Sequence, residues 1–355
     1  MPKLVTYPPL GNYQTAVSYL LKHIQHHPVL NPKPMTSKTL ELGSKNSPDF
    51  VCMPFKYTLG TYIEGLKQGA NVLFQLGGGC RYGYYSELQI QILKDLGYDF
   101  DYINLVSEGK TDIKQIIKKM KQLDPKFSTI KSLYYLFITT RMIKYMDQCD
   151  HFIRSNIGFE VENGSFEKLN QKMLYQFEHT KGYFHLLFTY LKYKRKFKKI
   201  KINKPHKCLK VGIIGELYTV MEPFANYELE RALAEYHISI KRYTNAYYLL
   251  FEKANKVKKY LKNTTDYIRY RMGADAADNI ARTKEMCKQK YDGIIHIKSA
   301  FCTPEIGAMP IIQKIAQEHN IPVLFFSFDS NTSEVGIKTR IEAFVDMLEM
   351  RRDYE

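Results

Sequence analysis

Residues 292–329 read DGIIHIKSAFCTPEIGAMPIIQKIAQEHNIPVLFFSFD, and this stretch is the clearest sign of the fold. Its first part, 292–299, is a short apolar run that predicts a β-strand. PEIGAMPIIQKIAQEH (304–319) has the apolar spacing of a helix, and IPVLFFSFD (321–329) is rich in strand-forming residues. A strand, a helix and another strand in this order predict a βαβ unit with parallel strands.

The same alternation occurs in two other parts of the chain. Working back from 292, a second α/β unit begins near Cys208 with the strand-like run CLKVGIIGE (208–216), followed by a helix predicted from Pro223 to residue 237. The first hundred residues also alternate, and strands are predicted over 4–9, 27–32, 49–54, 70–76 and 100–106. Residues 111–200 lack strand-like runs and predict two or three long helices.

These patterns predict the α/β class, with two open parallel sheets. The predicted boundaries are 1–110 for the first domain, 111–205 for a helical bridging segment and 206–355 for the second domain. A length of 355 residues agrees, because a single hydrophobic core rarely organises so long a chain.

Hydropathy gives no sign of a membrane segment. The mean hydropathy is −0.36, and no apolar run reaches the roughly 18 residues that would span a bilayer. The start, MPKLVTYPPLGNYQ, lacks the apolar region of a signal peptide. We therefore expect a cytoplasmic protein that does not bind a membrane.

The chain is strongly basic, with a formal net charge of +16. Much of the charge lies in the lysine-dense stretches 190–207 and 251–263. Nucleic acid is disfavoured as a partner because no nucleic-acid-binding module accompanies these stretches. A solvated lysine-rich face and a docking surface for an acidic partner or an anionic cofactor tail both remain open.

Three of the six cysteines share a setting. Cys52 lies in the predicted strand 49–54, Cys80 follows the predicted strand 70–76, and Cys302 follows the predicted strand 292–299. Ligands of open parallel sheets bind beyond the carboxyl ends of the strands. We therefore expect the three thiols to converge if the two sheet edges face each other.

Three thiolates can hold an iron–sulfur cluster or a zinc ion, because soft ligands select both. Their wide spacing is unlike the paired cysteines of structural zinc sites. The turn Gly77-Gly78-Gly79 would let backbone N–H groups approach a cluster or ligand closely. Ordinary buried thiols remain the alternative, and we expect a structural role for the other cysteines, Cys149, Cys208 and Cys287.

Long blocks around these cysteines are similar to a known family. PDFVCMPFKYTLGTYIEGLKQGANVLFQLGGGCRYGYYSELQIQILKDLGYDF (48–100) and DGIIHIKSAFCTPEIGAMP (292–310) resemble the family labelled CoA protein activase, within the 2-hydroxyacyl-CoA dehydratase superfamily. The resemblance covers about two-thirds of the chain. It implies flavodoxin-like or Rossmann-like domains flanking a cubane iron–sulfur cluster, with ligands that map onto Cys52, Cys80 and Cys302.

The resemblance also implies a partner, an ATP-dependent activase of the actin and sugar-kinase fold. The phosphate-binding motifs of that activase are absent from this sequence, so the chain resembles the electron-accepting component. The implied activity is low-potential reductive or radical dehydration, by a dehydratase-like lyase or a reductase component. An electron-transfer or double-cubane reductase-like protein without an acyl-CoA substrate is the alternative.

The resemblance leaves the cluster type and the assembly open. It implies [4Fe-4S] or a double cubane, a homodimer or heterodimer, and an acyl-CoA or another small substrate. The family's usual FGCMPE reads AFCTPE here (300–305). Because Phe301 replaces a small residue and Thr303 replaces methionine, we expect a tighter cluster pocket.

Four further residues are candidates for the site. Glu216 and Glu222 follow the predicted strand 208–216, where each could act as general acid or base. For Glu222, capping of the next helix is the alternative. Lys298 and Arg340 could hold an anionic group such as a CoA phosphate, and surface roles are equally open for both.

Overall fold

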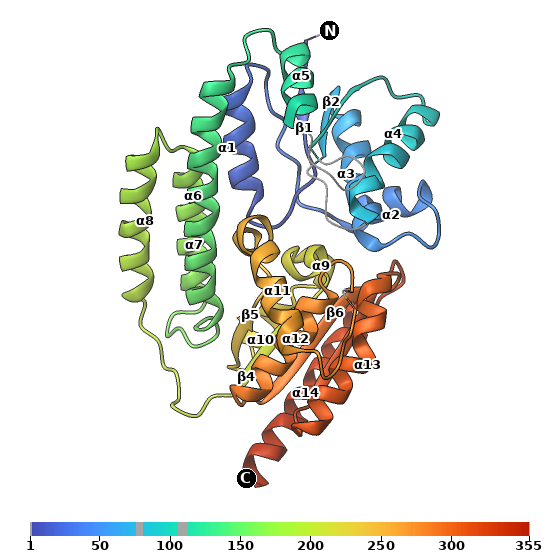
Figure 1. Cartoon of the computed structure of the whole chain (residues 1–355). Helices are drawn as coiled ribbons and strands as arrows, with labels where there is room; N and C mark the ends of the chain where they lie inside the picture. The colour runs from blue at the N-terminus through green and yellow to red at the C-terminus, as the bar shows by residue number, and fades with distance from the viewer. Residues whose placement is uncertain (1, 76–80, 106–112, 271, 355) are drawn as a thin grey trace. The chain divides into compact units, whose positions relative to one another are not determined.

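The computed structural model describes residues 2–75, 81–105, 113–270 and 272–354 (Figure 1). Two compact units divide the chain: the amino-terminal unit, Met1–Met142 with Phe177–Tyr183, and the carboxyl-terminal unit, Ile143–Gln176 with Phe184–Glu355. Within the described residues, all strand pairs of the two sheets are parallel. The predicted α/β class with two parallel sheets is therefore confirmed.

The amino-terminal unit is built on a three-stranded sheet in the order β1-β2-β3. These strands are β1 (Val5–Thr6), β2 (Val72–Gln75) and β3 (Asp101–Asn104), and Val72 of the central strand pairs with Val5 and Asp101. The helices around this sheet are α1 (Gln14–Ile24), α2 (Ser37–Lys45), α3 (Met53–Lys67), α4 (Tyr85–Asp95) and α5 (Ile113–Leu123), with a 3₁₀ turn η1 (Arg81–Tyr84).

Helices α2 and α3 approach each other at two glycines. A Cβ on Gly43 would lie 1.8 Å from the carbonyl oxygen of Lys56, and a Cβ on Gly60 would lie 2.0 Å from that of Thr39. Helix α2 begins after Thr36, because Thr36 and Thr39 form a capping box at its first turn.

Two predicted strands of this unit are wrong. In 27–32, Val29 forms only an isolated bridge to Val5. In 49–54, helix α3 already begins at Met53, and the Phe50 side chain is 80% exposed. Pro54 explains the second error, because proline favours the first turn of a helix and cannot donate to a sheet.

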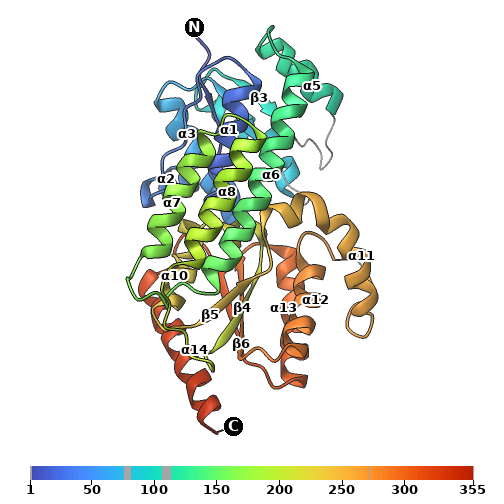
Figure 2. The same ribbon diagram turned by 90° about the vertical axis from the view of Figure 1, so that its left-hand side faces the viewer.

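The carboxyl-terminal unit holds a four-stranded sheet in the order β5-β4-β6-β7. Its strands are β4 (Lys210–Gly215), β5 (Ser239–Arg242), β6 (Gly293–Ser299) and β7 (Val323–Phe328). Helices α12 (Ala276–Lys288) and α13 (Thr303–Glu318) pack on one face, where Ile214 and Ile294 lie in the core. Helix α14 (Glu334–Tyr354) packs on the other face, against Gly293 (Figure 2).

Shorter elements complete this unit. They are α9 (Leu217–Met221), the 3₁₀ turn η2 (Phe224–Asn226), α10 (Leu229–Ala234), the π-helical turn η3 (Tyr248–Glu252) and α11 (Lys253–Asn263). The single helix predicted over 223–237 is wrong. Tyr227 and Glu228 adopt left-handed backbone angles, and the Asn226 side chain accepts a hydrogen bond from the Leu229 amide, so a new helix starts there.

The segment between the two sheets is helical as expected, with α5 followed by α6 (Thr129–Arg154), α7 (Ser165–Glu178) and α8 (Tyr183–Lys198). Helices α6 and α7 each contribute residues to both compact units. The three-part division at residues 110 and 205 remains a prediction. In the described part of the chain, no helix has the length and apolar character needed to cross a membrane.

Candidate functional site

Cys302 lies at the junction between β6 and α13. It is the N-cap residue of α13, its side chain makes no capping hydrogen bond, and Pro304 occupies the first turn. The backbone of this turn is fixed by a 3.0 Å hydrogen bond from the Cys302 amide to the Ser299 carbonyl. The cysteine is half-buried. Because β6 ends at Ser299, Cys302 lies beyond the carboxyl end of a central strand, as predicted.

Cys52 has the same local setting without the strand. It is the N-cap residue of α3, also half-buried, and Pro54 lies in the first turn of that helix. Its sulfur contacts the Tyr85 hydroxyl. The placement of Cys52 at the end of a strand was therefore wrong, although its position at a helix start matches that of Cys302. The shared pattern Cys-x-Pro was the sequence signal for these two helix starts.

The third predicted ligand, Cys80, and the turn Gly77-Gly78-Gly79 lie outside the described residues. Cys52 and Cys302 belong to different compact units. Across the residues that the structure does describe, no group of three or more His, Cys, Asp or Glu side chains is arranged to hold a metal ion. The convergence of the three thiols thus remains a prediction.

Three cysteines were expected to be structural, and two of them are deeply buried. Cys149 lies in α6 and Cys287 in α12. Burial raises the pKa of the Cys149 thiol to about 12 and that of the Cys287 thiol to about 11. Both are therefore protonated and poor metal ligands at neutral pH. Cys208 is half-buried and precedes β4.

Glu216 follows β4 and is buried. As N-cap of α9 it accepts hydrogen bonds from the Tyr218 and Thr219 amides, at 2.8 and 3.0 Å, and from the Thr219 hydroxyl at 2.5 Å. Burial raises its pKa to about 7, although these hydrogen bonds act in the opposite direction. A carboxyl group with this pKa can both accept and donate a proton near neutral pH.

Glu222 is also buried and ends α9. One of its carboxylate oxygens lies 3.4 Å from the Phe224 amide, which opens η2. The Glu222 carboxylate therefore contacts the start of the short turn η2. The long helix expected after Pro223, which Glu222 could have capped, does not form. A catalytic role for Glu222 remains a prediction.

Lys298 is buried, whereas Arg340 is exposed. Lys298 lies in β6 and is 3% exposed, with its ammonium near the Ala300 and Ser299 carbonyls at 3.3 and 3.5 Å. Arg340 lies in α14, where it donates to the Phe325 carbonyl at 2.7 Å and stacks over the Phe326 ring. Binding of an anionic group by either residue remains a prediction.

A buried polar network near Cys302 was missed by the sequence reasoning. His296 of β6 lies 2.7 Å from Glu305 of α13, and the Asn279 amide donates to the same carboxylate oxygen at 2.9 Å. All three side chains are buried. The signal was the presence of His296 and Lys298 in the otherwise apolar run GIIHIKS, since such residues are rarely buried without a partner.

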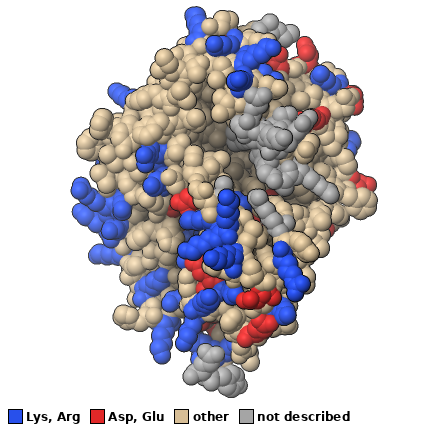
Figure 3. All heavy atoms as spheres, in the orientation of Figure 1, with Lys and Arg blue, Asp and Glu red and all other residues tan. Residues whose placement is uncertain are grey.

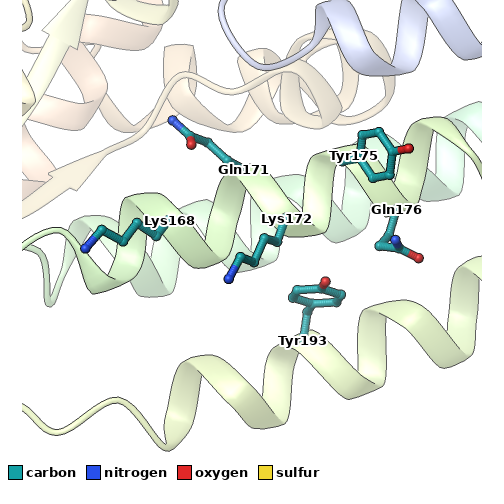
Figure 4. A pocket seen from close by; sticks show the side chains of 6 residues that line it. All are labelled: Lys168, Gln171, Lys172, Tyr175, Gln176 and Tyr193. Atoms are coloured by element: carbon teal, nitrogen blue, oxygen red, sulfur yellow. The ribbon is translucent and has the colours of Figure 1, made fainter.

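A groove of about 560 Å³ lies apart from these residues, between α7 and α8 (Figure 4). In this view, Tyr193 of α8 points toward Lys172 and Gln176 of α7. None of the predicted site residues lines it. Lys and Arg side chains are spread over elements of both units, interspersed with Asp and Glu (Figure 3).

The fold and site of the carboxyl-terminal unit thus define an α/β protein with a cysteine at the carboxyl edge of a parallel sheet. Residues 173–348 match the family model of the 2-hydroxyglutaryl-CoA dehydratase D-component. This match supports the resemblance of the chain to the 2-hydroxyacyl-CoA dehydratase superfamily. The match includes Cys302, Glu216, Glu222, Lys298 and Arg340, and it ends before Arg351. No curated protein matches the chain.

Proposed function

We propose that this chain is a cluster-holding, electron-accepting component of a dehydratase-like system. The observation that carries the proposal is the position of Cys302, which lies beyond β6, at the start of α13, inside the segment that matches the dehydratase D-component. Ligands of open parallel sheets bind at this edge. In this proposal Cys52, Cys80 and Cys302 are the ligands of a [4Fe-4S] or double-cubane cluster.

The chemistry of the two described cysteines fits this role. Each lies at a helix N-terminus, where the partial positive charge of the helix favours an anionic sulfur. Each is half-buried rather than enclosed in the core. The cluster would supply a low-potential electron, and the chain's own residues would hold the cluster and exclude water.

Glu216 is the residue that we assign to proton transfer. Its raised pKa lets it carry a proton at neutral pH, and its three hydrogen bonds fix the carboxyl group at the edge of β4. A substrate bound at the carboxyl edge of this sheet would lie within its reach. We propose an acyl-CoA or another small molecule as the substrate and an ATP-dependent activase as the electron donor.

The experiment is iron and sulfide quantification on anaerobically purified and reconstituted protein. We expect about four irons per chain for a single cubane and about eight for a double cubane. Cys52→Ser, Cys80→Ser and Cys302→Ser should each lose most of the iron, whereas the matched control Cys149→Ser should retain it. Wild-type protein without iron, or equal loss in Cys149→Ser, would overturn the proposal.

Electron paramagnetic resonance of the reduced protein separates the two forms of the proposal. With an acyl-CoA substrate at the cluster, adding acyl-CoA changes the spectrum of the reduced cluster. An unchanged spectrum over a panel of acyl-CoA esters supports an electron-transfer or double-cubane reductase-like protein. Phe301 favours this second form, because a large side chain stands beside Cys302 where the family usually has a small one.

A further inference from the structure

Helix α8 has two opposite faces, and each carries a line of side chains that we call a seam. The inner seam consists of Leu186, Tyr190, Tyr193 and Phe197, which are all buried. The Tyr190 ring stacks on Tyr145 of α6, with their centroids 4.2 Å apart. The Phe197 ring lies 6.4 Å from that of Phe166 of α7. The inner seam therefore holds α8 on the rest of the carboxyl-terminal unit.

The outer seam lies on the opposite face and has the same kind of spacing. It consists of Phe184, Phe188, Leu191, Arg195 and Lys198, at intervals of four, three, four and three residues. All five side chains are exposed, and those of Phe184 and Phe188 are 70% and 66% exposed. Alternating intervals of four and three residues place side chains in line along a helix, as in a coiled coil. The outer seam is thus an exposed helix face with the spacing of a helix–helix contact.

The amino-terminal half of α8 is apolar on both faces. A helix that is apolar all round is normally buried. On the outer seam, however, two phenylalanine rings and Leu191 follow one another in water. Contiguous exposed apolar side chains mark interaction surfaces, because covering them removes apolar area from water. The composition of the outer seam therefore favours an interaction surface over a solvated face.

The carboxyl-terminal half of the outer seam is basic. Arg195 and Lys198 continue the line of Phe188 and Leu191, and residues 179–215 contain no Asp or Glu. Among the described residues, neither of the two cations forms a salt bridge. A partner that covers this half gains electrostatic complementarity if it is acidic.

The carboxylates of the neighbouring helix α7 pair with other cations. Glu167 lies 4.0 Å from Arg231, and Glu178 lies 2.6 Å from Lys22. Helix α7 therefore does not supply the acidic complement of the outer seam.

We propose that the outer seam of α8 is the docking site for a helix of an acidic protein partner. The partner helix places apolar side chains over the two phenylalanines and Leu191, and carboxylates beside Arg195 and Lys198. The α8 helix of a second copy does not fit, because it has no acidic side chain. An anionic membrane does not fit either, since an interfacial helix keeps a continuous apolar face, whereas Arg195 interrupts this one after about two turns. The inference goes beyond the proposed function and does not depend on a cluster.

The test uses synthetic helical peptides of about 20 residues, which are long enough to cover α8. The matched peptide has leucine at the contact positions of one half and glutamate at those of the other half, and it is made in both orders so that either direction of the partner helix is represented. A mixed peptide has the same composition with leucine and glutamate interspersed, and a basic peptide has lysine in place of glutamate.

Fluorescence anisotropy measures the binding of each labelled peptide to the full-length chain. We expect one order of the matched peptide to bind at least about 10-fold more tightly than the mixed and basic peptides, because only this peptide complements both halves of the seam. Its affinity should fall as salt is added, because salt screens the exposed charges.

Two variants of the outer seam should weaken the binding of the matched peptide. Phe188→Ser removes a ring that the partner covers, and we expect a loss of about 10-fold or more. The double change Arg195→Glu with Lys198→Glu reverses the charge, and we expect a loss of about 10-fold. The charge-reversed protein should bind the basic peptide more tightly than the matched one. All three positions are exposed, and circular dichroism establishes that each variant is folded.

Matched controls separate the outer seam from the rest of the surface. Val335→Ser changes an exposed apolar residue of α14. The double change Lys258→Glu with Lys259→Glu alters the net charge by the same amount at exposed positions of α11. Both controls should bind the matched peptide as the wild type does.

Several results would overturn the proposal. Equal binding of the matched and mixed peptides is one, and wild-type affinity in both seam variants is another. Tighter binding to vesicles of phosphatidylcholine and phosphatidylserine, or to duplex DNA, than to the matched peptide would assign the seam to a membrane or to nucleic acid instead. A dimer in light scattering that Phe188→Ser dissociates would make a second copy the occupant.

Discussion

The His296 imidazole and the Glu305 carboxylate meet in the interior of the carboxyl-terminal unit, with Nε2 of His296 2.7 Å from Oε2 of Glu305. Both side chains are fully shielded from solvent. The pair joins the central strand β6 to the first turn of α13, the helix that begins at Cys302. It therefore links the position of the proposed cluster ligand to the core of the sheet.

Removing one partner of this pair should be strongly destabilising. We expect Glu305→Ala to lower the free energy of unfolding by about 3–5 kcal/mol, because the buried imidazole and the Asn279 amide lose their acceptor. Urea denaturation followed by circular dichroism measures the loss. Glu349→Ala, an exposed position on α14, is the matched control and should stay within about 0.5 kcal/mol of wild type. A similar small loss in Glu305→Ala would contradict a structural role for the pair.

Glu216 should make stability depend on pH. Its pKa in the folded protein is about 7, against an ordinary value of 4.5, so the folded state holds the proton more tightly than the unfolded state. The free energy of unfolding should therefore fall as the pH rises from about 4.5 to 7, and level off above that range. We expect Glu216→Gln to reduce this slope.

Urea denaturation at a series of pH values measures this effect, and the comparison must use slopes. Glutamine cannot reproduce the two carboxylate acceptors that bind the Tyr218 and Thr219 amides, so the variant should be less stable at every pH. Burial also raises the pKa of Asp275 and Asp278, which contribute with the same sign and remain in the variant. Identical slopes for the two proteins would show that Glu216 titrates normally.

Strands and helices with a strong local pattern could be predicted from the sequence. The run 292–299 became β6, and the periodic segment 304–319 became α13, because each pattern is set by residues close in sequence. Around Cys52 two local signals competed. The apolar FVC favoured a strand, whereas Pro54 favoured a helix start, and the helix formed.

The site was only partly predictable, because its contacts join residues far apart in the chain. The position of Cys302 followed from the end of β6, which is a local property. The capping role of Glu216 was missed, although its partner Thr219 lies three residues away. The burial of Lys298 depends on helices that pack on β6, and its place in the apolar run GIIHIKS was a local sign of burial that did not identify its contacts.

Arg282 of α12 should contribute to stability through three tyrosine rings. Its guanidinium carbon lies 4.7, 5.4 and 4.6 Å from the ring centroids of Tyr243, Tyr248 and Tyr260, which come from three different segments. We expect Arg282→Met to lower the free energy of unfolding by about 2 kcal/mol, the usual size for a desolvated cation–π contact. Arg282→Lys should recover only part, because an ammonium cannot stack as a planar guanidinium does.

Thermal or urea unfolding of the three proteins tests the role of these rings. Arg195→Lys, an exposed position on α8, controls for the general effect of replacing arginine by lysine and should be neutral. If Arg282→Lys is as stable as wild type, the charge alone accounts for the contribution of Arg282, and ring stacking adds nothing.

Gly60 should tolerate no side chain, because it lies where α2 and α3 are in backbone contact. A Cβ at this position would lie 2.0 Å from the Thr39 carbonyl oxygen, which is fixed by its own helix and cannot move like a flexible side chain. We expect Gly60→Ala to lower the free energy of unfolding by about 1–3 kcal/mol, the usual cost of overpacking a core.

Gly336 of α14 is the matched control, since a Cβ there would lie 4.0 Å from its nearest neighbour, the Cβ of Ser333. Gly336→Ala should be neutral or stabilising by up to about 1 kcal/mol, because alanine favours a helix more than glycine does. Equal effects in the two variants would mean that α2 and α3 can separate at little cost, and that their close approach does not stabilise the amino-terminal unit.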